Sequence, residues 1–218
     1  TAILMLTGAA VPVKADDVWK FDAQRFVLKE YTGTETDVVV PDTMDEGVPV
    51  KRLGTQLLAG SETLTSVVVP DSVTILDVGA LSYDNNLSEI TLSSNLINIG
   101  WNAISSNDAL TELTIPASVC IIDSYAVSGC YALKKIVFEG ACPLIGPEVF
   151  VMLSDDVVIY VPDDQIEEYK KVFEENNKNL NIQPSGKPAV LYSAEDYLDT
   201  ENLTFDAETG SITGYNGM

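Results

Sequence analysis

The side chains that most often do chemistry in proteins are sparse in this sequence. It contains no histidine, which removes the commonest general base and the commonest metal ligand. Its three cysteines, Cys120, Cys130 and Cys142, are odd in number and lack the C-x-x-C spacing of zinc or redox sites. We expect Cys130 and Cys142 to be buried packing residues. An alternative is a disulfide between Cys120 and Cys142, if they lie in neighbouring repeats.

Carboxylates are abundant, but their spacing does not suit acid–base catalysis. Pairs such as Asp155-Asp156 are adjacent in the chain, whereas the two acids of a glycosidase must converge across a cleft. Residues 42–46 lack the spacing of a calcium-binding loop, and no phosphate-binding or serine-hydrolase motif occurs. We therefore predict no catalytic residue, no metal site and no cofactor, so the chain is not expected to be an enzyme.

The overall charge excludes two classes of partner. The chain has 33 acidic and 12 basic residues among 218, a net charge of −21. Such a surface repels the phosphates of nucleic acids and the headgroups of anionic membranes, so neither is expected to bind. Because 46% of the residues are hydrophobic, the chain nevertheless has enough apolar material for a substantial core.

The N-terminal segment is typical of a secretory signal. Residues 2–13 are an apolar run that is too short to span a membrane, and the run ends in Val13-Lys14-Ala15, a small-x-small cleavage site. We interpret residues 1–15 as a signal-peptide remnant whose charged start is missing. The alternative is a buried N-terminal strand or helix. The signal-peptide interpretation predicts a secreted or cell-surface protein without membrane insertion.

An internal repeat organises most of the chain. Leu64, Leu87, Leu110 and Leu133 follow one another at intervals of 23 residues. Counting cysteine as apolar, apolar residues recur at offsets of 3, 5, 9, 12, 16 and 17 residues from each of these leucines. One such unit cannot bury its own apolar edge, whereas stacked units form a continuous core. The period therefore predicts a repeat solenoid.

Each unit is predicted to contain a short strand and a turn. The apolar residues at offsets three and five alternate with polar ones, as in a strand with one buried face. Pro70 and Pro116 end two of these strands, since proline cannot donate to a sheet. A second apolar pair turns the chain back, and a compact turn or short helix around Ala80 closes the coil.

The array has recognisable limits. A Val-Val-Val-Pro segment at 38–41 repeats the strand and its proline, but its proline lies 29 rather than 23 residues before Pro70. We assign residues 16–63 to opening strands and an irregular first repeat. Residues 64–162 form the regular array.

A helix is predicted to cover the last coil. Asp163 or Asp164 is expected to cap an amphipathic helix within residues 163–176, supported by a Glu167–Lys171 pair one turn apart. The apolar face of this helix consists of Ile166, Tyr169 and Phe173. A polar-faced terminal cap of this kind is what a repeat array needs for solubility.

The C-terminal region is predicted to leave the array. Residues 177–204 are interpreted as a linker because Asn, Pro and Gly are frequent in their first part. Residues 205–217 then align without gaps with residues 21–33, and both begin with Phe-Asp-Ala. We interpret residues 205–218 as the truncated start of a second repeat block.

The repeat units resemble the BspA-type, or Treponema pallidum-type, leucine-rich repeats of bacterial surface proteins. The resemblance rests on L-T-S-V-V-V-P-D-S-V-T-I-L at 64–76, L-T-E-L-T-I-P-A-S-V at 110–119 and A-V-S-G-C-Y-A-L at 126–133. It implies a right-handed leucine-rich-repeat superhelix of 23-residue units, built mostly of short β-strands with short helical turns. One departure is Ser93, which stands where the strand-ending proline is usual.

Candidate ligand-binding residues lie at offsets two and four, on the face of the strands opposite the core. Solenoids use such extended faces to bind partners. The candidates are Ser66, Val68, Glu89, Thr91, Glu112, Thr114, Lys135, Val137 and Tyr160. The alternative is that these residues form a solvated sheet, since valine and threonine are good strand formers.

Two functional hypotheses follow. The first is a non-catalytic binding or adhesion module on a bacterial surface, as the resemblance implies, which presents its sheet to a host or microbial protein or glycan. The second is a structural spacer that holds a distal domain away from the cell. The identity of the ligand and the oligomeric state stay open.

Overall fold

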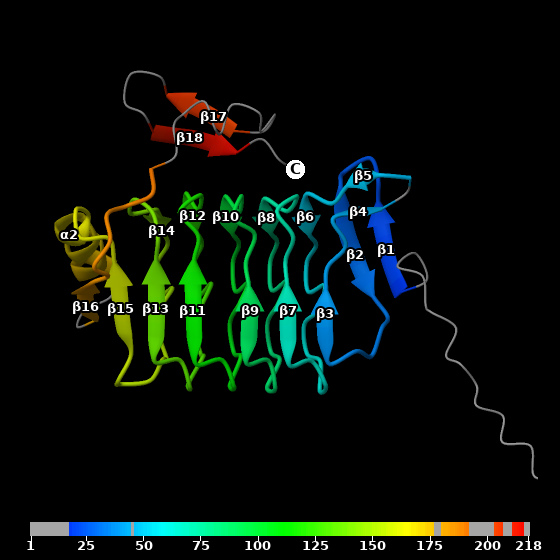
Figure 1. Ribbon diagram of the computed structural model, residues 1–218, viewed down its shortest axis with the longest axis horizontal. Coiled ribbons are helices and arrows are strands. Elements are labelled where there is room, and N and C mark those ends of the chain that lie inside the picture. The colour runs from blue at the N-terminus through cyan, green and yellow to red at the C-terminus, as the bar shows by residue number, and fades with distance from the viewer. Residues whose placement is uncertain (1–17, 45, 177–179, 192–202, 207–210, 216–218) are drawn as a thin grey trace, which may run out of the picture.

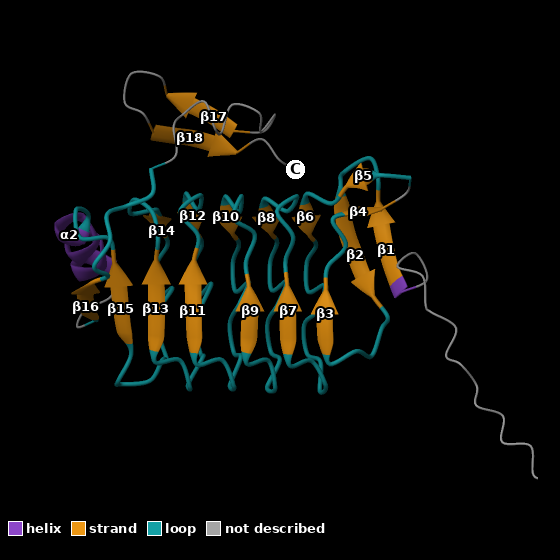
Figure 2. Ribbon diagram, in the orientation of Figure 1, coloured by secondary structure: helices purple, strands orange, loops and turns teal. Residues whose placement is uncertain are grey.

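The structure is a computed structural model that describes residues 18–44, 46–176, 180–191, 203–206 and 211–215. The predicted signal-peptide remnant, residues 1–15, lies outside this range. The chain forms a solenoid in which strands lie on two sides of a stack of coils (Figure 1). Short strands and turns make up these coils, and the helix lies at the C-terminal end of the stack (Figure 2).

The longer strands of the solenoid form the front series. This series consists of β3 (Asp37–Val39), β7 (Ser66–Val68), β9 (Glu89–Thr91), β11 (Glu112–Ile115), β13 (Lys135–Phe138), β15 (Val158–Val161) and β16 (Asn181–Pro184). The rear series consists of β6 (Arg52–Leu53), β8 (Ile75–Leu76), β10 (Asn98–Ile99), β12 (Ile121–Ile122) and β14 (Leu144–Ile145). All pairings within each series are parallel.

The register of the strands follows the sequence repeat. Ser66 pairs with Glu89 on the front side, and Asn98 pairs with Ile121 on the rear side, a 23-residue step in both cases. The irregular first step is also present, because Asp37 pairs with Ser66. These pairings confirm the predicted solenoid of 23-residue units.

The core runs the length of the stack and is made by the repeating apolar positions. Leu64, Leu87, Leu110 and Leu133 are all at most 1% exposed. Buried residues from every coil join one continuous hydrophobic cluster, which explains why no single coil needs to be stable alone. Ile90, Cys142 and Ile145 are exceptions, because they are only partly buried although they occupy core positions; Cys142 was predicted to be buried, as Cys130 is.

The turns that follow the rear strands use a left-handed backbone at two fixed positions. One column has positive φ at Gln56, Gly79, Asn102, Tyr125 and Glu148. The other has positive φ at Gly60, Tyr83, Ser106, Gly129 and Met152. Glycine adopts this conformation freely, whereas other residues pay about 1–2 kcal/mol for it. The closing segments are therefore compact turns whose geometry is set by the stack.

Met152→Gly is expected to raise the free energy of unfolding by roughly 0.5–1 kcal/mol, because it removes left-handed strain at an exposed side chain. Met152 has a φ of 58° and is 61% exposed, so little packing is lost with its side chain. Urea denaturation measures the change. Asp155→Gly, an exposed site without positive φ, is the matched control and is expected to be destabilising; equal effects at both sites would contradict the strain argument.

A ladder of polar groups, half-buried at Ser61 and buried in the next three coils, fixes the chain where each turn returns to the front series. It occupies Ser61, Asp84, Asn107 and Cys130, which are spaced by the repeat. The Oδ1 atom of Asn107 accepts a hydrogen bond from the Asp84 N–H at 3.0 Å, and its Nδ2 donates to the carbonyl oxygens of Leu81 and Ile104 at 2.8 and 2.9 Å. These bonds satisfy backbone groups that water cannot reach.

Asp84 holds the same place in the preceding coil and accepts the equivalent backbone hydrogen bond, but it cannot make the two bonds that Asn107 donates. Its Oδ1 accepts the Ser61 N–H at 2.5 Å, while its Oδ2 is buried without a hydrogen-bond partner. A carboxylate offers no donor where the amide of Asn107 offers two. Burial raises the pKa of Asp84 from 3.8 to about 7.

The helix α2 (Ile166–Asn176) covers the last coil, as predicted. Tyr169 and Phe173 are buried, and their rings lie 5.0 and 6.2 Å from the ring of Phe138. The Tyr169 hydroxyl also donates to the backbone carbonyl oxygens of Gly140 and Ala141, each at 3.1 Å. The helix therefore closes the apolar end of the stack with aromatic rings.

Two details of the predicted cap are wrong. The side chains of Asp163 and Asp164 do not bond the start of the helix; they accept the backbone N–H groups of Gly186 and Ala189, both at 2.8 Å. These carboxylates hold the segment at 185–190, which turns back after β16 and which we call the returning segment. The sequence alone did not predict that it lies beside them. The ion pair on the helix joins Glu167 to Lys170 at 3.1 Å rather than to Lys171.

Residues 177–204 were predicted to be a linker, but part of this segment continues the sheet. The strand β16 pairs in parallel with β15, with Val158 opposite Asn181. The chain then turns back, and the Val190 N–H donates to the Glu139 carbonyl oxygen at 2.9 Å. Unpaired backbone of β15 provides the partner for β16, and the Glu139 carbonyl oxygen, just after β13, provides the partner for Val190, so this largely polar segment joins the stack.

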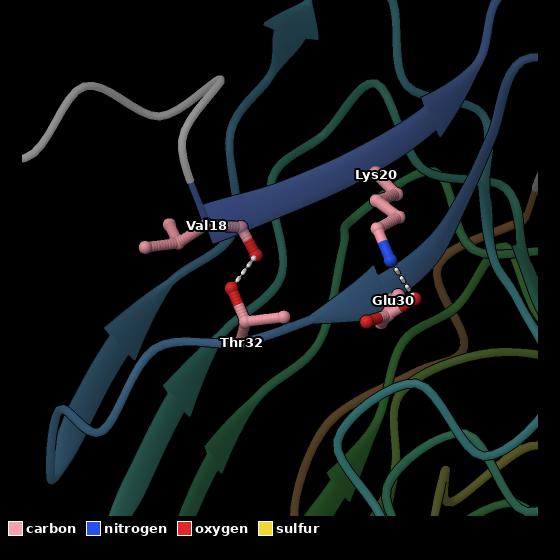
Figure 3. Close-up of polar contacts among 4 residues, drawn as sticks. All are labelled: Val18, Lys20, Glu30 and Thr32. Carbon is pink, nitrogen blue, oxygen red and sulfur yellow. Dashed lines mark hydrogen bonds and ion pairs between the residues drawn. The ribbon is translucent and has the colours of Figure 1, made fainter.

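An antiparallel hairpin opens the stack. It consists of β1 (Trp19–Asp22) and β2 (Val27–Tyr31), and β2 joins the rear series through β6. Figure 3 shows two of its cross-strand contacts, the Lys20–Glu30 ion pair and the hydrogen bond from Thr32 Oγ1 to the Val18 carbonyl oxygen. Two short strands, β4 (Thr43–Met44) and β5 (Val48–Pro49), form a separate antiparallel pair.

A second hairpin repeats the first near the C-terminus. β17 (Leu203–Asp206) pairs with β18 (Ser211–Tyr215) in the register of β1 and β2, and its bulge precedes Phe205 as the bulge of β1 precedes Phe21. This equivalence supports a second repeat block starting here, which stays a prediction.

Candidate binding surface

The predicted binding residues project from the front series away from the core. Val67, Ile136 and Ile159 are fully buried, whereas Val68 is 39% exposed. All nine predicted residues are exposed or half-buried: Ser66, Val68, Glu89, Thr91, Glu112, Thr114, Lys135, Val137 and Tyr160. We call this surface the front face. Its place follows from the two-residue alternation of a strand whose other side is in the core.

The front face is divided between two sheets. β3, β7 and β9 form a three-stranded sheet, and β11, β13, β15 and β16 form a four-stranded one. On the rear side the same coils stay joined, because β10 pairs with β12. The continuous sheet expected from the sequence is therefore interrupted between β9 and β11 (Figure 1). Nothing in the local sequence explains this break.

The first part of the front face carries Ser66, Val68, Glu89 and Thr91. The Ser66 hydroxyl donates to Asp37 Oδ1 at 2.6 Å. Hydrogen bonds from Ser66, Thr36 and Thr65 lower the pKa of the Asp37 carboxyl, so this group stays ionised. Within the described residues, no side chain forms an ion pair or hydrogen bond with the Glu89 carboxylate. Glu89 is thus available to a ligand.

The second part carries Glu112, Thr114, Lys135, Val137 and Tyr160. The Lys135 Nζ atom lies 3.0 Å from Glu112 Oε2, across the β11–β13 pair. Both side chains are well exposed, so this ion pair contributes little to stability and can exchange for a ligand contact. Thr114, Val137 and Tyr160 follow one another on neighbouring strands and add an uncharged surface beside it.

A pocket adjoins the second part of the front face. Its volume is about 210 Å³, and its walls include Val137, Phe138, Pro162, Pro188 and Val190. The returning segment after β16 supplies the last two of these residues and so forms one wall. The pocket is mainly apolar and is the size of a large side chain or a small ligand fragment. The linker interpretation of residues 177–204 does not predict this pocket, because it places no segment beside the front face.

A group of exposed and half-buried aromatic side chains lies on the turns, outside the predicted binding residues. Tyr83 is 52% exposed and Trp101 is 48% exposed, both on the turns that follow rear strands. The Trp101 and Tyr125 rings lie edge to face with centroids 6.2 Å apart. Their irregular spacing in the sequence hides this grouping. The only available signal was the presence of aromatic residues at turn positions, where burial does not require them.

The thiols are poorly suited to nucleophilic chemistry. The structure holds all three cysteines as free thiols. Burial raises the pKa of the Cys130 thiol to about 11 and, together with the charge of Glu168, raises that of Cys142 to about 12. Since the thiolate is the reactive form, both groups are unreactive near neutral pH. In the described part of the chain, no cluster of three or more Cys, Asp or Glu side chains is arranged to hold a metal ion.

The comparison with family models decides the family. Residues 51–181 match six copies of the BspA type Leucine rich repeat region. The chain belongs to this family. The match covers the coils from β6 to the start of β16, so the BspA-type units predicted from the sequence are those that build the solenoid. Members of the family are typically non-catalytic binding modules.

Solved structures of other bacterial proteins share the fold of this chain. A leucine-rich cell surface protein of Faecalibacterium prausnitzii is 21% identical with a TM-score of 0.51, over 83% of this chain and 39% of that one. The pneumococcal vaccine antigen PcpA is 18% identical with a TM-score of 0.54, over 79% and 46%. This BspA-type chain thus spans less than half the length of either protein. At these identities the likeness shows the fold alone.

A shorter protein gives a higher identity. A leucine-rich repeat protein of Bacteroides capillosus is 34% identical over 56% of this chain and 93% of that chain, with a TM-score of 0.49. The comparison with curated proteins gave no match. No helix among the described residues of this BspA-type protein is long and apolar enough to cross a membrane.

Proposed function

We propose that this protein is a non-catalytic binding module that acts outside a bacterial cell. Its front face binds a protein or glycan of a host or of another microbe. The observation that carries this proposal is a row of outward side chains, repeated over successive strands, that ends beside an apolar pocket. Rigid parallel strands hold these side chains in fixed positions, so binding requires little loss of conformational freedom.

The chemistry of the front face supports this role. Glu89 and the exposed Glu112–Lys135 pair provide charge, and Thr114 provides hydrogen bonding, while Val137 leads into the pocket. A ligand that inserts an apolar group into the pocket gains affinity there, and polar contacts along the strands give specificity. Extracellular location is supported by the predicted signal-peptide remnant and by the family, whose surface-protein members suggest adhesion.

Thr114→Arg is expected to lower affinity at least about tenfold, because a long charged side chain then stands in the centre of the front face. The test measures binding of the chain to immobilised matrix proteins, mucins and glycans at physiological salt. Leu144→Arg is the matched control, since Leu144 lies on the rear strand β14 and is 61% exposed. Equal loss from both variants would assign binding to charge alone. If the folded chain binds nothing in the panel, a structural spacer becomes the better account.

A further inference from the structure

The turns that follow the rear strands carry a connected group of side chains, which we call the turn patch: Tyr83, Trp101, Asn102, Tyr125 and Glu148. Tyr83, Trp101 and Glu148 are exposed and Tyr125 is half-buried, whereas Asn102 is buried beneath them. The Asn102 amide Nδ2 donates to the Tyr83 hydroxyl at 3.1 Å. The Trp101 and Tyr125 rings meet edge to face. The Tyr125 hydroxyl donates to the Glu148 carboxylate, and this bond raises the pKa of the phenol. Residues from four successive turns therefore form one surface.

Core packing does not account for this patch. Tyr83 and Trp101 are about half exposed, and the hydrophobic core closes beneath them without their rings. Tyr83, Asn102, Tyr125 and Glu148 all have positive φ. Glycine occupies the same two turn positions in other coils, as Gly79 and Gly129 show. Tyr83 and Glu148 are exposed and Tyr125 is half-buried at these strained positions, which points to a surface role for their side chains.

The negative charge of the turns indicates that a partner of the turn patch is positively charged. The turn segments at 54–60, 77–83, 100–106, 123–129 and 146–152 contain no lysine or arginine, and three of them carry one carboxylate each, Asp77, Asp123 and Glu148. The face of an aromatic ring attracts cations, most strongly for tryptophan, and arginine stacks on such rings. With a net charge of −21, the whole chain also attracts basic partners. A cationic side chain is thus complementary both to the rings and to Glu148.

We propose that the turn patch binds a basic segment of a partner protein. An arginine or lysine side chain lies against Trp101 and Tyr125, and the Glu148 carboxylate accepts its hydrogen bonds. Exposed tryptophan and tyrosine are the residue types that most often dominate protein interfaces. The patch lies on the turns after the rear strands, so this second surface is separate from the front face and does not depend on the function proposed for it.

The test uses a hexa-arginine peptide and the full chain at physiological salt, where long-range attraction is screened. Trp101→Ala is expected to weaken peptide binding about tenfold, and Glu148→Gln severalfold. Tyr131→Ala and Glu62→Gln are matched controls, because both residues are exposed and lie outside the patch. They are expected to bind the peptide as the unmodified chain does. Thermal unfolding of each variant shows that the fold is retained.

Two results would overturn the proposal. Equal weakening by the patch variants and the control variants would show that the peptide senses only the overall negative charge. Binding of neutral oligosaccharides such as maltohexaose or chitohexaose, lost in Trp101→Ala while peptide binding is kept, would assign the patch to glycans instead. The intrinsic fluorescence of Trp101 gives an independent readout. A peptide-induced change in emission that persists in Trp101→Ala would place the bound cation elsewhere.

Discussion

Asp84→Asn is expected to raise the free energy of unfolding by on the order of 3 kcal/mol at about pH 8 and to change it little at about pH 3. Asp84 is fully buried, and its Oδ2 atom has no hydrogen-bond partner. The amide of Asn107 occupies the same place one coil later and donates two hydrogen bonds to backbone carbonyls. An asparagine at position 84 can provide the donors that a carboxylate lacks.

The pH dependence follows from the raised pKa of Asp84. The carboxyl ionises at about 7 in the folded chain but near 3.8 when exposed, so between these values the folded state binds more protons. The free energy of unfolding is therefore highest below pH 3.8, falls as the pH rises toward 7, and levels off above that value. The asparagine variant lacks this slope. Urea denaturation of both proteins across this pH range measures the difference.

Asn107→Asp is the mirror control for Asp84→Asn. It places a carboxyl group against the carbonyl oxygens of Leu81 and Ile104, where the amide now donates. The variant is expected to be less stable at about pH 8 and to regain part of the loss in acid, as its own carboxyl becomes protonated. A stability difference between Asp84→Asn and the unmodified chain that does not vary with pH would show that the Asp84 carboxyl has the same pKa in the folded and unfolded states, which contradicts this explanation.

Phe138→Ala is expected to lower the free energy of unfolding by about 3–5 kcal/mol, because it leaves a cavity in the aromatic cluster beneath α2. Phe138 is 2% exposed, and its ring centroid lies 6.2, 5.0 and 6.2 Å from those of Phe150, Tyr169 and Phe173. Urea denaturation followed by far-ultraviolet circular dichroism measures the loss.

Tyr131→Ala is the control for the aromatic cluster. Tyr131 is 55% exposed in the adjoining turn, so its removal is expected to change stability by no more than about 0.5 kcal/mol. If Phe138→Ala were as mild as this control, α2 would not be part of the same cooperative unit as the coils. A smaller slope of the free energy of unfolding against urea concentration, rather than a lower midpoint of the transition, would instead indicate that α2 unfolds separately.

The sequence predicted most of the fold because the solenoid is a periodic object. Leucines at a fixed interval determine both the register of the strands and the side of each strand that is buried. The apolar face of α2 was predictable for the same reason, since Tyr169 and Phe173 are one helical turn apart. These features depend on local periodicity and on a core to which every coil contributes alike.

Other parts of the fold depend on contacts that no local pattern records. The strand β16 has little apolar character, and it forms because β15 offers it unpaired backbone. The left-handed turns at Tyr125 and Glu148 lack the glycine that signals such a backbone. The raised pKa of Asp84 arises only when the coils on either side exclude water from it.

The front face, too, has features that the sequence predicts and features that it does not. Alternation along the strands was sufficient to predict that Thr114 and Val137 point outward. It did not reveal the break between β9 and β11, which depends on how neighbouring coils pair. Nor did it reveal the pocket, because that cavity exists only after the segment carrying Pro188 and Val190 folds back beside β13.

Carboxyl footprinting of the chain, free and bound to the partner found in the binding panel, tests the central claim most directly. A carbodiimide and an amine label exposed carboxylates, and mass spectrometry reports the labelling of each one. If the front face is the binding surface, labelling of Glu89 and Glu112 falls in the complex while that of Glu62 does not. Unchanged labelling of Glu89 and Glu112 in a saturated complex would contradict the account.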